Sequence, residues 1–170
     1  MYYNITIEMV NCGLKCGEKP PKVHRKGVTL MFTGEFNHTL DSKNRLFIPA
    51  KHREELGETF MVVRSIRENC IKVYSLEEWD RFLKPIMELP RKTGEATLRF
   101  LHRNAAQVSP DSQGRILLPV GLVEYAQIVR NAVVVGCGSY AEIWAEENYN
   151  VAVEDEDQEA IKLALEEAGL

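Results

Sequence analysis

The sequence lacks any long hydrophobic run. No apolar segment approaches the ~20 residues that a membrane-spanning helix needs, although 45% of the residues are hydrophobic. The N-terminus also lacks the basic-then-apolar order of a secretory signal. With 170 residues, of which 27% are charged, the chain has the composition of one ordinary globular domain or two very small ones. We therefore expect a cytoplasmic protein that does not insert into a membrane.

Sequence signatures of catalysis are also missing. The chain contains no Gly-x-Ser-x-Gly elbow, no phosphate-binding glycine loop and no His-Glu-x-x-His motif. His38 and Asp41 are close in sequence, but no nucleophile accompanies them in a recognisable context. We therefore expect no enzymatic activity and no cofactor.

Cysteine is scarce, and its positions do not suggest a disulfide framework. Cys70 and Cys137 lie in apolar, strand-like segments and are most simply small buried residues. Cys12 and Cys16, together with His24, could supply three zinc ligands, but no fourth ligand is evident. A leader segment without a metal is the favoured interpretation of that region.

Positive charge is rare in the last third of the chain. The formal net charge is -4, and residues 106–170 carry three Lys/Arg against twelve Asp/Glu. Residues 31–105, in contrast, carry thirteen Lys/Arg against eleven Asp/Glu. The acidic balance of the whole chain therefore does not exclude an anionic partner for its middle segment.

A motif is present twice, at a shift of 70 residues. The chain contains "LDSKNRLFIPA" at 40–50 and "PDSQGRILLPV" at 110–120. The corresponding residues are Asp41 and Asp111, Ser42 and Ser112, Arg45 and Arg115, Ile48 and Leu118, and Pro49 and Pro119. Downstream, "IKVYSLEEW" corresponds to "AEIWAEENY" at the same shift. Two copies are too few for a solenoid, so the repeat predicts a pseudo-two-fold unit.

Each copy has the pattern strand, tight turn, strand, short helix, strand, strand. The segment 35–40 alternates polar and apolar residues as a half-buried strand does, and Asn44 and Gly114 suit turn positions with positive φ. Helices are predicted over 50–56, over 76–89 with a Ser75–Glu78 capping box, and over 94–105. Pro85 should end or kink the second of these helices. Trp79 and Trp144 are expected in the core rather than on a stacking platform.

The repeated turn carries the strongest functional signal. Asp41 and Asp111 can each cap their turn and pair with the arginine four residues later, which is a purely structural role. The functional alternative is an outward role for the cations, because Lys43, Arg45, Lys51 and Arg53 face only one acidic residue, Asp41, between positions 37 and 53. A strand-and-turn element of this size can enter a DNA groove. The second copy keeps Arg115 but has Gln113 in place of the lysine, so it should contribute less to electrostatic binding.

From Met31 onward the chain resembles the MraZ family of bacterial regulators. The segments that carry the resemblance are "MFTGEFNHTLDSKNRLFIPAKHRE", "VSPDSQGRILLP" and "YAEIWAEENY", and it covers about residues 31–150. It implies a mainly β fold with appended helices (α+β), in which two AbrB-like repeats form a swapped-hairpin β-barrel. The expected parts are an extension over 1–30, a first repeat with linking helices over 31–104, a second repeat over 105–150 and an acidic tail over 151–170.

The resemblance also implies a function. Members of the family bind direct repeats in double-stranded DNA upstream of their own division and cell-wall gene cluster, as ring homo-oligomers of eight or twelve subunits associated with the nucleoid. By this resemblance Arg45 and Arg115 would contact DNA, with Lys43 as a neighbour, while Asp41, Ser42, Asp111 and Ser112 shape the turns. The alternative is an oligomeric scaffold or protein-interaction module without DNA specificity.

Residues 1–30 do not match either copy of the repeat. Arg25–Val28 can be encoded by a purine-rich run typical of a bacterial ribosome-binding site, only a few codons before Met31. We therefore expect translation to start at Met31. Mass spectrometry of the N-terminal peptide of the native protein tests this, and a peptide that begins before Met31 would contradict it.

Overall fold

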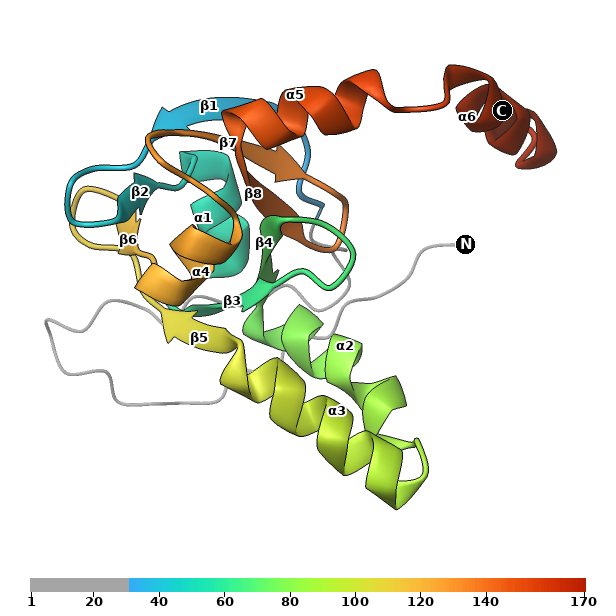
Figure 1. Ribbon diagram of the computed structural model, residues 1–170, viewed down its shortest axis with the longest axis horizontal. Coiled ribbons are helices and arrows are strands. Elements are labelled where there is room, and N and C mark those ends of the chain that lie inside the picture. The colour runs from blue at the N-terminus through green and yellow to red at the C-terminus, as the bar shows by residue number, and fades with distance from the viewer. Residues whose placement is uncertain (1–30) are drawn as a thin grey trace, which may run out of the picture.

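The computed structural model describes residues 31–170, which form a curved antiparallel sheet with helices packed around it (Figure 1). The elements are β1 (Glu35–Thr39), β2 (Arg45–Phe47), α1 (Ala50–Leu56), β3 (Phe60–Arg64), β4 (Cys70–Ser75), α2 (Leu76–Met87), α3 (Arg91–Arg103), β5 (Ala105–Val108), β6 (Arg115–Leu117), α4 (Val120–Tyr125), β7 (Asn131–Gly136), β8 (Ala141–Ala145), α5 (Glu146–Glu154) and α6 (Gln158–Glu167). Both copies of the repeat thus have the predicted order of strand, turn, strand, helix, strand, strand.

The strands of the two copies interleave. One sheet has six strands in the order β1-β7-β8-β4-β3-β5, and a separate two-stranded ribbon is formed by β2 and β6. The first strand of each copy pairs with the third strand of the other copy, as β1 with β7 and β5 with β3. The ribbon and the central β4–β8 pair also join one copy to the other. This exchange confirms the pseudo-two-fold unit predicted from the repeat.

The six-stranded sheet is open, because β1 and β5 form its two edges and do not pair with each other. The coarser prediction, a mainly β fold with appended helices, is confirmed. Closure into a barrel and the swapped-hairpin description remain predictions.

One main core fills the concave side of the sheet. It is lined by alternate residues of the strands, such as Val62, Val73 and Ile143, since successive side chains of a strand point to opposite faces. The ribbon contributes Leu46 and Ile116, both fully buried, to this same core. The core is therefore what holds the ribbon against the sheet.

A second, smaller core lies on the opposite face, under the α2–α3 hairpin. Trp79 and Leu83 of α2 and Leu101 of α3 pack there against the sheet. The Ser75 side chain accepts a hydrogen bond from the backbone N–H of Glu78 at 3.2 Å, which is half of the predicted capping box. Pro85 lies inside α2, and the helix ends two residues later at Met87.

Helix α3 begins at Arg91, three residues before the predicted start, since Pro90 occupies its N-cap position and pre-sets the backbone there. The buried Gly94 allows the close approach of the preceding segment. A Cβ at this position would lie 3.1 Å from the carbonyl oxygen of Ile86.

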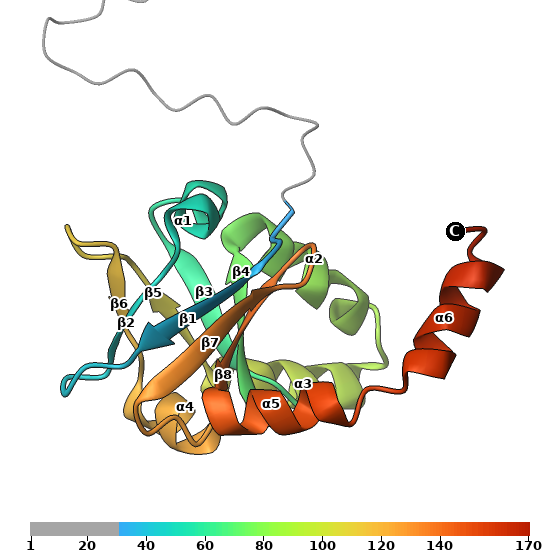
Figure 2. The same cartoon turned by 90° about the horizontal axis from the view of Figure 1, so that it is seen from above.

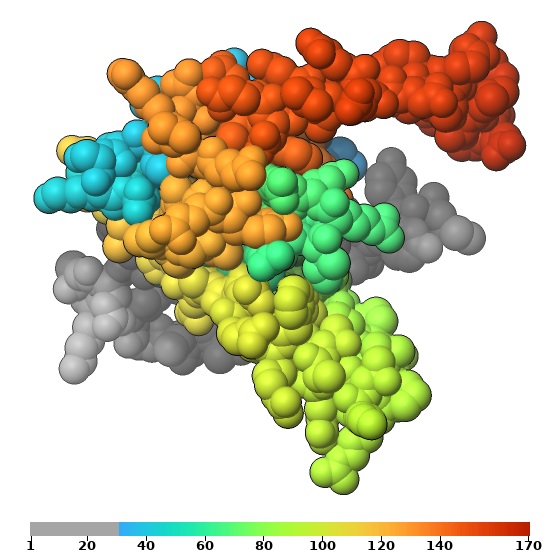
Figure 3. Space-filling view, viewed as in Figure 1, coloured from blue at the N-terminus to red at the C-terminus, as the bar shows by residue number. Residues whose placement is uncertain are grey.

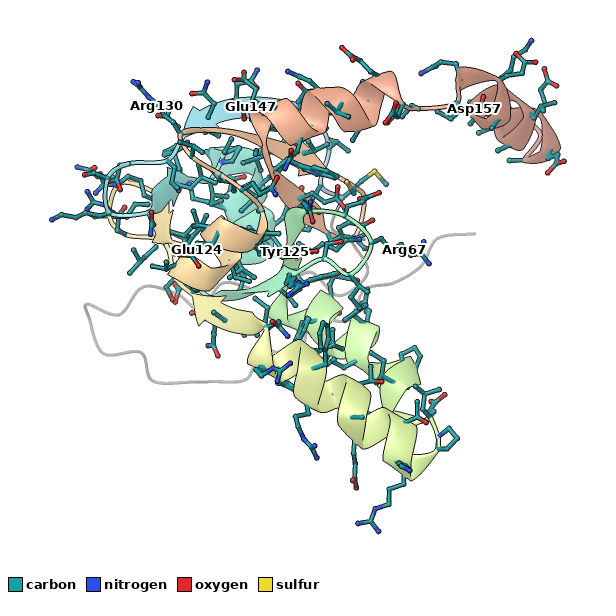
Figure 4. The ribbon with its side chains drawn as sticks, in the orientation of Figure 1. Arg67, Glu124, Tyr125, Arg130, Glu147 and Asp157 are labelled. Carbon is teal, nitrogen blue, oxygen red and sulfur yellow. The ribbon has the colours of Figure 1, made fainter. Side chains whose placement is uncertain are left out.

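The C-terminal segment is helical. Helix α5 runs along β7 and β8 and continues past residue 151, the first residue of the predicted acidic tail (Figure 2). Helix α6 projects away from the body of the protein (Figures 2 and 3). The Asp157 side chain, labelled in Figure 4, caps α6 by accepting hydrogen bonds from the backbone N–H groups of Glu159 and Ala160. Among the described residues, no helix has the length and apolar character needed to cross a membrane.

The two faces of the ribbon should differ sharply in their effect on stability. Ile116 is fully buried whereas its neighbour Leu117 is 61% exposed. We expect Ile116→Ala to lower the free energy of unfolding by about 2–5 kcal/mol, and Leu117→Ala to change it by less than about 0.5 kcal/mol. Denaturant unfolding of both variants measures this, and equal effects would contradict the placement of Ile116 in the core.

Candidate nucleic-acid interface

In the first turn, one carboxylate binds two different groups. Asp41 Oδ1 accepts hydrogen bonds from the backbone N–H groups of Lys43 and Arg45, each at 2.9 Å. Asp41 Oδ2 accepts a hydrogen bond from Arg45 Nε at 2.7 Å, and it also forms an ion pair with Arg45 Nη2 at 2.7 Å. Asn44 completes the turn with φ of 57°, a left-handed conformation that asparagine tolerates. The aspartate therefore fixes both the backbone of the turn and the arginine that follows it.

The second turn repeats this arrangement. Asp111 Oδ1 accepts from the backbone N–H groups of Gln113 at 2.9 Å and Arg115 at 3.0 Å. Asp111 Oδ2 accepts from Arg115 Nε at 3.0 Å and Nη2 at 2.8 Å. Gly114, with φ of 80°, occupies the position of Asn44. The predicted structural role of both aspartates is present in the geometry.

These hydrogen bonds favour the ionised carboxylate. The backbone N–H of Arg45 lowers the pKa of Asp41, with smaller contributions from the N–H of Lys43 and the Arg45 side chain. The backbone N–H and the guanidinium of Arg115 lower the pKa of Asp111 to about 2. Both aspartates are therefore charged at neutral pH, and each offsets the charge of its arginine.

The two turns lie at opposite ends of one ribbon. Strands β2 and β6 pair antiparallel, with Leu46 opposite Ile116. The end of β2 reaches the second turn, where the N–H of Ile48 donates to the carbonyl of Gly114 at 3.1 Å. The N–H of Leu118 donates to the carbonyl of Asn44 at 2.9 Å in the equivalent place. Two segments 70 residues apart are thus joined into a single element.

The outer face of the ribbon combines cations with apolar side chains. Arg45 lies opposite Leu117, and Arg115 lies opposite Phe47. Residues directly opposite in an antiparallel pair share a face, so all four project away from the core. We refer to Arg45, Phe47, Arg115 and Leu117 as the ribbon face. Sequence reasoning had identified its arginines but not its apolar residues, although alternation along "RLF" and "RIL" would have indicated them.

Each aspartate leaves its arginine able to bind a further acceptor. A guanidinium has five N–H donors in a planar fork. Asp41 and Asp111 occupy the side formed by Nε and Nη2. The end formed by the two Nη atoms retains donors, and the side chains of Arg45 and Arg115 remain 33% and 28% exposed. Each arginine is therefore held in one orientation with donors left over.

The other predicted cations separate in the structure. Arg53 of α1 reaches the ribbon, because its Nε donates to the carbonyl of Ile48 at 3.0 Å and its guanidinium lies 5.4 Å from the centre of the Phe47 ring. A Cβ at Gly114 would lie 2.7 Å from the Arg53 guanidinium carbon, so a larger residue here would displace the Arg53 side chain. Lys51 instead bonds the Thr33 hydroxyl at 2.6 Å, away from the ribbon.

His38 adds no charge to this surface. Burial lowers the pKa of His38, and its ring lies 5.2 Å from the ring of Phe47. It is therefore neutral at pH 7 and acts as a packing partner. Trp79 and Trp144 are 5% and 6% exposed, which confirms their prediction as core residues.

One group of side chains elsewhere has the spacing of metal ligands. The ligand atoms of Glu68, Cys70 and Glu142 lie within 4.8 Å of one another. The Lys72 ammonium is 3.5 Å from Glu142, and burial raises the pKa of Cys70 to about 12. The Lys72 cation, paired with one of the three groups, disfavours a metal ion there. The predicted alternative of Cys12, Cys16 and His24 lies outside the described residues.

The lowered pKa of Asp111 should be measurable directly. Its folded value of about 2 lies below the ordinary 3.8, so its contribution to stability is complete above about pH 4 and is lost as the pH falls towards 2. In Arg115→Ala we expect the pKa to rise but to stay below 3.8, because the backbone N–H groups remain. NMR titration of the carboxyl carbon tests this, with Arg99→Ala as a control. A wild-type value near 3.8 would contradict the geometry.

Comparison with known proteins places residues 31–168 in one family. The MraZ family model, described as "MraZ protein, putative antitoxin-like", matches twice, at residues 31–100 and 101–168. A transcriptional regulator MraZ of Clostridium tetani is 42% identical over 139 residues, which cover 79% of this chain and 97% of that protein. That of Clostridium acetobutylicum is 39% identical over 143 residues, covering 82% and 100%. That of Carboxydothermus hydrogenoformans is 43% identical over 122 residues, which cover 71% of this chain and 85% of that protein.

The chain belongs to the MraZ family.

Proposed function

We propose that this protein is a sequence-specific DNA-binding transcriptional regulator whose ribbon face contacts double-stranded DNA. The observation that carries the proposal is the pairing of both Asp-x-x-x-Arg turns into one ribbon, which presents Arg45 and Arg115 together with donors available. The relatives named transcriptional regulator MraZ support it. No catalytic step is part of this function.

A two-stranded ribbon has the dimensions to enter the major groove of B-DNA. The free donors on the Nη atoms of Arg45 and Arg115 can bind guanine O6 and N7, or phosphate oxygens, while each arginine stays bonded to its aspartate. Because the arginines are pre-oriented, little side-chain entropy is lost when DNA binds. Lys43, at the tip of the first turn, adds a point charge that contacts phosphate. The second turn has Gln113 in its place, which can hydrogen-bond a base edge.

The net charge of one ribbon is small, so a single subunit would bind DNA weakly. A ring homo-oligomer, an octamer or a dodecamer, would present several ribbons to spaced direct repeats. Linked contacts can raise the overall affinity by ~10²–10⁴ without new interactions. The DNA in question is the region upstream of the protein's own division and cell-wall gene cluster, which places the regulator on the nucleoid in the cytoplasm. Closure of the sheet and ribbon into a swapped-hairpin barrel belongs to the same proposal.

An oligomeric scaffold is the second candidate. It is favoured by the apolar side chains of α6, of which Ile161, Leu163 and Leu165 are 42–52% exposed. Such a protein would show neither sequence preference nor a steep salt dependence with DNA. The same binding experiment therefore separates the two functions.

Loss of the first arginine tests the proposal. We expect Arg45→Ala to weaken binding to the upstream repeats at least about fivefold, since one bidentate contact contributes about 1–3 kcal/mol. Fluorescence anisotropy across a salt series measures this, against scrambled DNA. Wild-type binding should fall with salt, with a logarithmic slope near -0.9 for each phosphate contact.

Two matched variants give this experiment its controls. Arg99→Ala removes an exposed cation from α3, far from the ribbon, and should bind like the wild type. Asp41→Asn keeps an oxygen for the turn amides but loses the acceptor for Arg45, so it should weaken binding while the fold is retained. Normal binding by Arg45→Ala, with the oligomer intact, would exclude the ribbon as the contact surface.

A further inference from the structure

Two apolar side chains on the ribbon face offer no hydrogen-bond donor or charge to DNA. Phe47 is 36% exposed and Leu117 is 61% exposed, whereas Leu46 and Ile116 beside them are fully buried. A single exposed leucine on a protein surface needs no explanation. These two, however, occupy corresponding positions in the two copies, 70 residues apart, and each lies directly opposite an arginine. Phe47 and Leu117 are therefore placed to contact apolar groups of a ligand that also binds the neighbouring cations.

We propose that Phe47 and Leu117 pack against the C5-methyl groups of thymines in the major groove, and that this contact contributes sequence preference. The inference rests on the proposed DNA-binding function. The thymine methyl is the apolar group that B-DNA displays in its major groove, and aromatic or aliphatic side chains contact it there. Phosphate contacts alone carry no sequence information.

The surroundings of the two side chains favour DNA over a protein partner. Arg45 and Arg115 lie across the ribbon from Leu117 and Phe47, and the Arg53 guanidinium lies beside the Phe47 ring. Among the described residues, the acidic groups bonded to these cations are Asp41 and Asp111, which bind the arginines from the side. The face is therefore apolar at two points and otherwise offers hydrogen-bond donors, which complements a groove lined by acceptors, methyl groups and phosphates.

The geometry also suits two contacts rather than one. The opposed pairs Arg45–Leu117 and Phe47–Arg115 are two residues apart along the ribbon, which is about 7 Å. That spacing corresponds to about two base-pair steps of 3.4 Å. The Phe47 ring is also held in place between the His38 ring and the Arg53 guanidinium, so it is pre-organised for contact. Each half of the ribbon thus presents one arginine and one apolar side chain.

Replacement of thymidine by deoxyuridine removes the methyl groups and tests the inference. We expect the wild-type protein to bind the deoxyuridine form of its upstream DNA about fourfold more weakly for each thymine methyl group that Phe47 or Leu117 touches. Leu117→Ala should bind the thymidine form several-fold more weakly than the wild type, and Phe47→Ala,Leu117→Ala should no longer distinguish the two DNAs. The slope of the salt dependence should not change, because no phosphate contact is removed.

Controls separate this inference from the function on which it rests. Ile66→Ala shortens an apolar side chain of similar exposure, 66%, in the β3–β4 loop and should bind both DNAs like the wild type. Leu117 is exposed, so its variant remains informative even if Phe47→Ala disturbs the hairpin. Repeat binding that requires Arg45 but is equal for both DNAs would overturn the thymine contact alone.

Two other outcomes would also overturn it. Dissociation of the oligomer in Leu117→Ala, seen by sedimentation velocity, would assign the apolar pair to a contact between subunits. An absence of DNA binding by the wild-type protein would overturn the proposed function and this inference together.

Discussion

In each turn one aspartate binds both the backbone of the turn and the following arginine, and the proposed DNA-binding surface depends on this interaction. In both copies Oδ1 holds two backbone N–H groups and Oδ2 holds the guanidinium. The pairs are about one-third exposed to solvent, so their direct contribution to stability is modest. Their effect is geometric, because the carboxylate fixes the turn, the start of the strand and the direction of the arginine at once. Replacement of the aspartate by alanine would therefore affect the turn and the orientation of the arginine together.

The exchange of strands between copies makes the repeat a single structural unit. In each copy, the first strand and the ribbon strand pair with strands of the other copy. Leu46 and Ile116, at the centre of the ribbon, are buried in a core that both copies build. The distance between Arg45 and Arg115 is thus set by backbone pairing and core packing rather than by a linker. A rigid spacing is what recognition of a fixed sequence requires, since a misplaced donor loses its acceptor.

Local features of this fold could be predicted from the sequence, and long-range ones could not. Helix α1, the order of elements in each copy, the Ser75 cap and the aspartate–arginine pairs follow from turn chemistry and periodicity. The pairing partner of each strand does not, because it depends on contacts between residues that are far apart along the chain. The sequence likewise grouped Lys51 with Arg53 as neighbouring cations, yet Lys51 bonds Thr33 while Arg53 packs on the second turn. Residues two positions apart on a helix point in different directions, and only tertiary packing decides what each one meets.

The same ion pairs that orient the arginines also limit the affinity of one subunit. Asp41 and Asp111 offset the charges of Arg45 and Arg115, which leaves Lys43 and Arg53 as the main net charge at the ribbon. Two uncompensated cations release few counterions on binding, so non-specific attraction to DNA should be weak. Each aspartate fixes the direction of its arginine but also cancels its charge. Such a pair favours specificity of binding over affinity for DNA in general. If the proposed function holds, such a surface would gain useful affinity when several copies act together. Each added ribbon would contribute its own contacts, while the entropic cost of association would arise only once.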